Sequence, residues 1–135
     1  MELLDVDRID HGNACLDDPE LVQDLVRKQT PLTVCPLSNL RLKLVPSPEV
    51  HPLKRMLDAG LLVTVNSDDP AYFGGYITEN LVVCQEALAL SLDDIATLPR
   101  NGFSAAFIAA DEASSGRARV DAYVERHRRM FEAAT

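Results

Sequence analysis

The stretch Val63–Pro70, VTVNSDDP, decides the fold expected for this chain. Its β-branched apolar residues are typical of a buried strand, and the strand ends in the adjacent carboxylates of Asp68 and Asp69. In α/β proteins, functional sites lie at the carboxyl ends of parallel strands. The stretch also has a structural interpretation, because an aspartate before a proline is a common helix N-cap. Taken alone, it favours the capping role over a catalytic one.

Two more strands and two helices are predicted before this stretch. The strands are expected over Arg8–Asp10 and Leu32–Cys35, and the third strand over Leu61–Val65. A helix over Pro19–Gln29 and another over Pro52–Gly60 separate them. Short, almost wholly apolar strands that alternate with helices indicate parallel strands joined by crossover helices.

The remaining segments are predicted to be a loop and helices. A long loop is expected over Ser38–Pro48, which is rich in proline. The C-terminal half is predicted to consist of four helices. The first covers Thr78–Leu90, and the second is capped by Ser91, continues through Leu98 and ends at Pro99–Gly102. The third pairs Phe103 with Phe107, and the last has Val120, Tyr123, Val124 and Phe131 on one face.

Three parallel strands alone make a poor sheet. Parallel sheets need both faces covered, and two open edges invite pairing with another strand. The opening residues Met1–Val6 also resemble the last turn of a helix. We therefore expect residues 1–135 to form a single unit that is the C-terminal part of a larger α/β architecture, or that assembles with partner copies.

Composition excludes several classes of protein. The 135 residues are 47% hydrophobic and 25% charged, and no apolar run reaches the ~20 residues of a membrane span. A net charge of −8 argues against a nucleic-acid binder. Cys15, Cys35 and Cys84 form no CxxC pair, and Cys35 and Cys84 lie in apolar runs typical of the core. The sequence also shows no basic segment followed by an apolar run at its start, as a signal peptide would have. Together these features favour a cytoplasmic protein without membrane or nucleic-acid partners.

The polar residues after each strand would meet at one rim of a parallel sheet. These residues are Asp10–Gly12, Cys35–Asn39 and Asn66–Asp69. One imidazole, that of His11, together with two carboxylates suits metal binding or acid–base chemistry. Imidazole and carboxylate are ligands that zinc accepts, and zinc activates a bound water. His11 could equally be a hydrogen-bonded structural residue.

A complete catalytic zinc site is not expected from these residues alone. Such a site takes about three protein ligands and an open position. His51 precedes Pro52 and is expected to cap a helix or to lie on the surface, and His127 is expected to be solvated among arginines. His11 with Asp68 would therefore be an incomplete site.

Three motifs together resemble the C-terminal portion of the adenosine/adenine deaminase family. They are RIDHG at 8–12, CPLSN at 35–39 and VNSDDP at 65–70. Members of that family are zinc-dependent (β/α)8 barrels, and the motifs match the ends of the sixth, seventh and eighth strands in order. The run Ser67–Tyr76 resembles the adenine deaminase (adenine aminohydrolase) branch more than the adenosine branch.

The resemblance implies a role for each matching residue. His11 would be catalytic, orienting and stabilising the zinc-bound hydroxide as it attacks C6 of the purine. Asp68 would be a zinc ligand. Asp69 would bind substrate through N7 of the ring, with a proton on one of the two groups, and Gly12 would let the substrate approach the strand end. The loop after the second strand would line the pocket with Ser38 and Asn39.

The resemblance also implies a reaction and leaves alternatives open. The parent reaction is the hydrolysis of adenine to hypoxanthine and ammonia. The family's HxH pair, its third zinc-binding histidine and its proton-shuttling glutamate have no counterpart here, so we expect the isolated chain to be incomplete and inactive. The partner would be a missing N-terminal barrel portion. Alternatives are adenosine as the substrate, and a catalytically dead remnant that forms homo-oligomers through its open strand edges.

Overall fold

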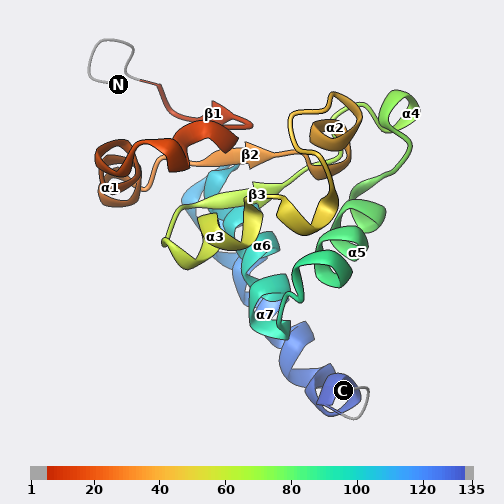
Figure 1. Cartoon of the computed structure of the whole chain (residues 1–135). Helices are drawn as coiled ribbons and strands as arrows, with labels where there is room; N and C mark the ends of the chain where they lie inside the picture. Colours follow the sequence, from red (N-terminus) through yellow and green to blue (C-terminus); the bar gives the residue numbers. More distant parts are fainter. Residues whose placement is uncertain (1–5, 133–135) are drawn as a thin grey trace.

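A parallel sheet forms the centre of the structure. The computed structural model describes residues 6–132, and within this range the sheet consists of β1 (Ile9–Asp10), β2 (Leu32–Val34) and β3 (Val63–Val65), in that order (Figure 1). All three predicted strands are confirmed, each slightly shorter than expected. The helical turn predicted over Met1–Val6 lies outside the described residues except for Val6.

The register aligns the strand ends. Ile9 lies opposite Leu32 in the β1–β2 pair, and Leu32 lies opposite Val63 in the β2–β3 pair. Because both pairs are parallel, the carboxyl ends of all three strands lie on one side of the sheet (Figure 1). The outer edge of β3 is partly covered, since Asn101 Nδ2 donates to the carbonyl of Val63 at 2.8 Å. Within residues 6–132, no further strand pairs with either edge.

Helices α1 (Pro19–Lys28) and α3 (Leu53–Asp58) connect the strands, close to the predicted ranges. Asp18 caps α1, because its Oδ1 accepts from the backbone N–H groups of Glu20 and Leu21 at 3.0 and 3.1 Å. The capping signal therefore placed this helix start correctly.

The loop predicted over Ser38–Pro48 is wrong at its beginning. Helix α2 (Pro36–Arg41) starts directly after β2, and Pro36 occupies its first turn, where no backbone donor is needed. The backbone N–H of Leu37 also finds an acceptor in Asn80 Oδ1 at 3.0 Å, from a helix more than 40 positions away. That tertiary contact could not be read from the local sequence.

The C-terminal half is helical, as expected, but its boundaries differ. The helices are α4 (Pro70–Phe73), α5 (Ile77–Leu88), α6 (Leu92–Ala105) and α7 (Ala110–Glu132). None of the helices in the described range is both long and apolar enough to cross a membrane.

The helix break predicted at Pro99–Gly102 is wrong. Helix α6 continues through Pro99, although a proline in a helix interior removes one hydrogen bond at a cost of about 3 kcal/mol. Burial of Leu98 and the bond from Asn101 to β3 hold the helix across this point. Phe103 consequently belongs to α6, whereas Phe107 lies outside any helix, so the predicted pairing of the two rings in one helix is also wrong.

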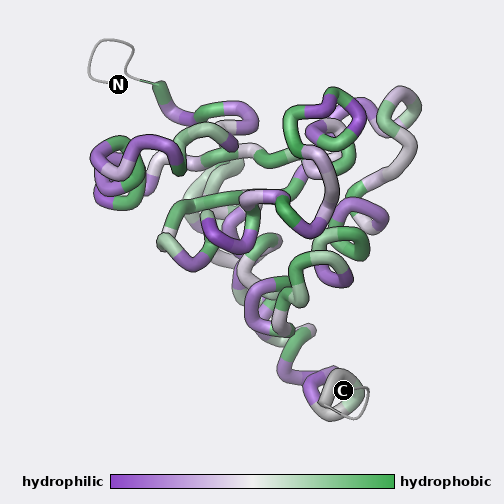
Figure 2. The backbone as a smooth tube through the Cα atoms, in the orientation of Figure 1, coloured by the Kyte–Doolittle hydropathy of each residue, from purple (hydrophilic) through white to green (hydrophobic). Residues whose placement is uncertain are grey.

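The core lies around β2 and β3. Figure 2 shows hydrophobic residues along β3 at the centre, while the outer helices alternate between hydrophobic and hydrophilic residues. The side chains with no exposed surface include those of Leu25, Leu32, Leu53, Met56 and Val63. Cys84 is buried in the same cluster, as predicted.

His51 anchors the segment that precedes α3. Only 4% of the residue is exposed, so the surface location allowed from sequence is wrong. The expected bond to the helix start is present, because Nδ1 accepts from the backbone N–H of Leu53 at 3.2 Å. Nε2 lies 3.1 Å from Asn39 Oδ1. Burial lowers the pKa of His51 to about 4.

The buried imidazole predicts a specific pH dependence of stability. An unfolded histidine has a pKa of about 6.5, so between about pH 6.5 and 4 the unfolded chain binds a proton that the folded chain does not. The free energy of unfolding should therefore fall as the pH drops through this window, by about 2 kcal/mol from this group between pH 7 and 5. Urea denaturation at both pH values should show that His51→Gln reduces this loss.

The matched control is His127→Gln, which removes a more exposed imidazole from α7. It should leave the pH dependence of the wild type unchanged. An unchanged pH dependence in His51→Gln would contradict the assignment of a neutral, buried His51.

Candidate active site

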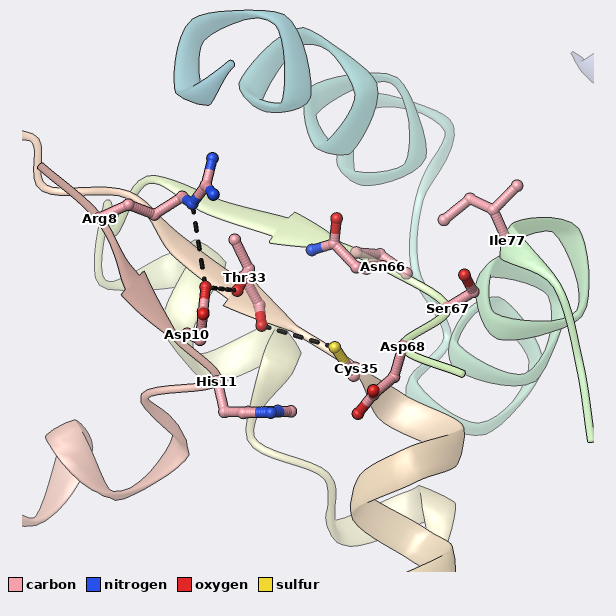
Figure 3. Close-up of a pocket in the computed structure, with 10 residues that line it drawn as sticks. Arg8, Asp10, His11, Thr33, Cys35, Asn66, Ser67, Asp68 and Ile77 are labelled. Carbon is pink, nitrogen blue, oxygen red and sulfur yellow. Dashed lines mark hydrogen bonds and ion pairs between the residues drawn. The ribbon is translucent and has the colours of Figure 1, made fainter. Parts of the chain in front are cut away.

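An open pocket lies at the carboxyl ends of the strands (Figure 3). Its volume is about 630 Å³, within the range of pockets that bind small molecules. The residues that line it come from the ends of all three strands and from α5: Arg8, Asp10, His11, Thr33, Cys35, Val65, Asn66, Ser67, Asp68 and Ile77. The rim predicted from the strand pattern is therefore a real concave surface.

Three possible metal ligands converge in this pocket. His11, Cys35 and Asp68 each offer a ligand atom, and these atoms lie within 4.8 Å of one another. Figure 3 shows the imidazole of His11 and the carboxylate of Asp68 extending toward the region of Cys35. Nitrogen, sulfur and carboxylate oxygen are donor types that zinc accepts, and Asp68 offers the carboxylate that fits one position of a zinc site. The predicted meeting of His11 and Asp68 at one rim is confirmed.

Cys35 was interpreted from sequence as a core residue. The side chain is indeed buried, but it also lines the pocket. Burial first, and then the nearby carboxylates of Asp68 and Asp10, raise the pKa of its thiol to about 11. The thiol is therefore protonated at neutral pH and is a poor nucleophile. The sequence places Cys35 both in an apolar run and at the predicted rim, and the structure agrees with both placements.

Backbone strain coincides with the site. His11 and Asp68 have positive φ angles of 62° and 57°, in the left-handed region that few residues other than glycine adopt. Each such residue costs of order 1 kcal/mol and persists only where the surroundings enforce it. At His11 the backbone N–H donates to the carbonyl of Thr33 at 2.9 Å, which extends the β1–β2 pairing to the strained residue.

The two adjacent aspartates have different positions. Asp69 is the N-cap of α4, because its Oδ1 accepts from the backbone N–H of Tyr72 at 3.0 Å, and it does not line the pocket. Asp68 lines the pocket. The capping interpretation thus applies to Asp69, and the interpretation as a rim carboxylate applies to Asp68.

Gly12 is required by the backbone and by packing. Its φ angle is +74°, and an added Cβ would lie 2.7 Å from the Leu32 side chain, which is fully buried. Gly12 starts the 3-10 helix η1 (Asn13–Asp17) and does not line the pocket. The structure therefore gives this glycine a local role beside the catalytic histidine candidate.

Arg8 and Asp10 hold the outer side of the pocket. The Arg8 guanidinium lies 4.3 Å from the centroid of the Phe107 ring, and its Nη1 donates to the carbonyl of Ala105 at 3.4 Å. Asp10 Oδ1 accepts from the Thr33 hydroxyl at 2.8 Å. These contacts tie β1 to β2 and to the end of α6. Sequence reasoning gave Arg8 and Thr33 no role in the site, because the partners that position them are distant in the chain.

Ser38 and Asn39 lie behind the pocket. Both are fully buried in α2 and neither lines the pocket. Asn39 Nδ2 lies 3.4 Å from Nδ1 of His11, so Asn39 contacts the candidate catalytic residue from its buried side. Ser38 Oγ has no hydrogen-bond partner among the described residues.

Comparison with known proteins identifies the family of this chain. Residues 1–123 match the family model described as adenosine deaminase. An adenine deaminase from Rhodopseudomonas palustris is 59% identical over 127 residues, which cover 94% of this chain and 37% of that protein. An adenine deaminase from Hahella chejuensis is 50% identical over 94% of this chain and 38% of its own length. The chain thus spans little more than a third of these relatives.

Solved structures share the fold. The adenine deaminase from Arthrobacter aurescens superposes with a TM-score of 0.88 at 45% identity, covering 92% of this chain and 38% of that one. An amidohydrolase from Burkholderia ambifaria, solved with bound Zn, superposes with a TM-score of 0.87 at 27% identity over 98% of this chain and 37% of its own. The expected fold class, the C-terminal part of a (β/α)8 barrel followed by helices, is confirmed. With the family match over residues 1–123, the chain belongs to the adenosine deaminase family.

Proposed function

We propose that this chain supplies one side of the active site of a zinc-dependent purine deaminase. The reaction is the hydrolysis of adenine to hypoxanthine and ammonia. The observation that carries this proposal is the convergence of His11 and Asp68, from separate strand ends, within 4.8 Å at one pocket. The names of the relatives from Rhodopseudomonas palustris and Hahella chejuensis support adenine over adenosine.

Each residue contributes a distinct interaction. Asp68 would hold zinc through its carboxylate at the rim, with the remaining ligands supplied from outside these 135 residues. When bound, zinc lowers the pKa of water and so provides a nucleophile at neutral pH. His11 orients the attacking oxygen toward C6 of the purine. Asp69, which caps α4 through Oδ1, would engage N7 of the purine through Oδ2, with a proton on one of the two groups.

The rest of the barrel would complete the sheet. We infer that residues 1–135 act as one unit, the C-terminal segment of a barrel domain, because the outer edges of β1 and β3 have no partner strand within residues 6–132. Exposed apolar side chains also lie after the carboxyl ends of the strands, on α4 and α5 and in the loop after α2: Leu42, Leu44, Tyr72 and Ile77. A complementary portion of about two thirds of a relative's length would cover them.

Complementation tests this proposal. The chain should be coexpressed with the N-terminal part of the Rhodopseudomonas palustris adenine deaminase that it lacks. Neither part alone should release ammonia from adenine or retain stoichiometric zinc by metal analysis, and the assembled pair should do both. Deaminase activity of the zinc-loaded 135-residue chain alone would contradict the claim that most ligands lie outside it.

The competing interpretation is a catalytically dead protein that forms homo-oligomers through its open strand edges. Analytical ultracentrifugation of the isolated chain tests this interpretation, because a monomer at all concentrations would contradict it. In the assembled pair, turnover of adenosine at the rate of adenine would contradict the choice of substrate.

Asp68→Asn should abolish function without loss of folding. Asparagine tolerates the left-handed backbone of this position, so the free energy of unfolding should stay within about 0.5 kcal/mol of the wild type. The lost carboxylate should lower zinc retention and the kcat/KM of the assembled pair by at least about 100-fold. Denaturation and steady-state assays on the same preparation measure both effects.

Asp18→Asn is the matched control. Asp18 carries a carboxylate, as Asp68 does, but uses it to cap α1, and asparagine is an equally good N-cap. This variant should keep both stability and activity. Equal loss of activity in the two variants would remove the special role assigned to Asp68.

A further inference from the structure

A buried polar chain reaches His11 from behind the pocket. Its members are Leu53, His51 and Asn39, and the exposed fractions of His51 and Asn39 are 4% and 0%. The backbone N–H of Leu53 lies 3.2 Å from His51 Nδ1, His51 Nε2 lies 3.1 Å from Asn39 Oδ1, and Asn39 Nδ2 lies 3.4 Å from His11 Nδ1. The chain thus links the start of α3 to the candidate catalytic imidazole.

The first bond determines the direction of the second. A backbone N–H can only donate, so His51 Nδ1 must be the acceptor and carries no proton. A neutral imidazole then has its single proton on Nε2. The atom of Asn39 that faces Nε2 must therefore be the carbonyl oxygen. Burial favours this neutral form, since it lowers the pKa of His51 to about 4.

The orientation of Asn39 then determines the state of His11. With Oδ1 directed at His51, the amide nitrogen Nδ2 is the atom that faces His11. An amide nitrogen only donates, so His11 Nδ1 must accept and carries no proton. In this orientation Asn39 Oδ1 also accepts from Asn13 Nδ2 at 2.8 Å.

We propose that Asn39 and His51 are positioning residues that hold His11 as the neutral tautomer with its proton on Nε2. The tautomer follows from the hydrogen bonds alone, whereas its importance for catalysis rests on the proposed deaminase function. In this state Nδ1 is occupied by Asn39 and Nε2 is a donor. An imidazole binds a metal only through an unprotonated nitrogen, so His11 stays outside the ligand set that its distance to Asp68 would permit.

The consequence concerns what His11 does in the pocket. A neutral imidazole with Nε2–H donates a hydrogen bond to an oxygen atom and does not take up its proton. His11 therefore holds an attacking oxygen by donation, and proton removal falls to another group. The three buried members, Leu53, His51 and Asn39, are all needed for this state of His11, because each hydrogen bond determines the direction of the next.

Nuclear magnetic resonance of the full 135-residue chain tests the tautomer directly. Uniformly ¹⁵N-labelled protein is recorded at neutral pH with long-range ¹H–¹⁵N correlation of the histidine rings, and each ring is assigned from its His→Gln variant. We expect His11 and His51 to show a protonated Nε2 and an unprotonated Nδ1. A protonated Nδ1 on His11 would overturn the proposal, whether or not any deaminase activity is found.

His127 provides an internal reference in the same spectrum. Its Nδ1 lies 2.8 Å from the backbone carbonyl of Tyr123, which can only accept, so its hydrogen-bonded form carries the proton on Nδ1. The two tautomers should therefore appear side by side in one sample.

Asn39→Asp should place a proton on Nδ1 of His11. The ionised aspartate has the same shape but offers only acceptors to both neighbours, so His11 Nδ1 must become a donor while His51 keeps its proton on Nε2. The control is Gln85→Glu, which makes the same amide-to-carboxylate change at an exposed position of α5 and should leave the His11 signals unchanged. If the Asn39→Asp protein does not fold, the wild-type spectrum still decides the question.

Catalysis provides a second readout in the complemented enzyme. Asn39→Asp should lower kcat by about 10- to 100-fold, as loss of an orienting partner does, with a smaller effect on KM. The Gln85→Glu control should retain kcat. A normal kcat together with a protonated Nδ1 on His11 would show that the position of the proton does not matter for the reaction.

Discussion

The parallel pairing of β2 with both of its neighbours is the constraint on which the site depends. Its register sets Ile9, Leu32 and Val63 side by side, so the residues that follow each strand emerge at the same level. His11, Cys35 and Asp68 come from three separate parts of the chain and meet only because of this alignment. A slip of one residue would turn alternate side chains to the opposite face of the sheet and separate them.

The site contains backbone conformations and buried polar groups that destabilise the folded state by themselves. His11 and Asp68 both adopt left-handed backbone angles, and His51 and Asn39 are polar groups without access to water. Such features persist because the surroundings compensate them, through hydrogen bonds to buried polar atoms and through the core packed around β2 and β3. The strain and the buried polar chain both converge on His11, which connects the energetics of this region to its proposed chemistry.

Local signals predicted much of the fold. The β-branched strands, the Asp18 cap and the general order of helices depend on neighbours within a few positions, and these features are present in the structure. Predictions failed where a distant residue intervened. Helix α2 begins early because Asn80 accepts from Leu37, and α6 continues through Pro99 because Asn101 bonds to β3 and Leu98 is buried. These partners are separated by tens of residues and leave no periodic signal in the sequence.

The sequence by itself determined that an imidazole follows the first of three parallel strands and two carboxylates follow the third, because strand pattern and chain order suffice to place strand ends on one rim. Only the tertiary structure separated the positions of the two aspartates, since Asp69 Oδ1 caps α4 through Tyr72 whereas Asp68 lines the pocket. It also decided that Asn39 and His51 lie behind His11. The physical reason is that the direction of a hydrogen bond depends on which donor faces which acceptor in space.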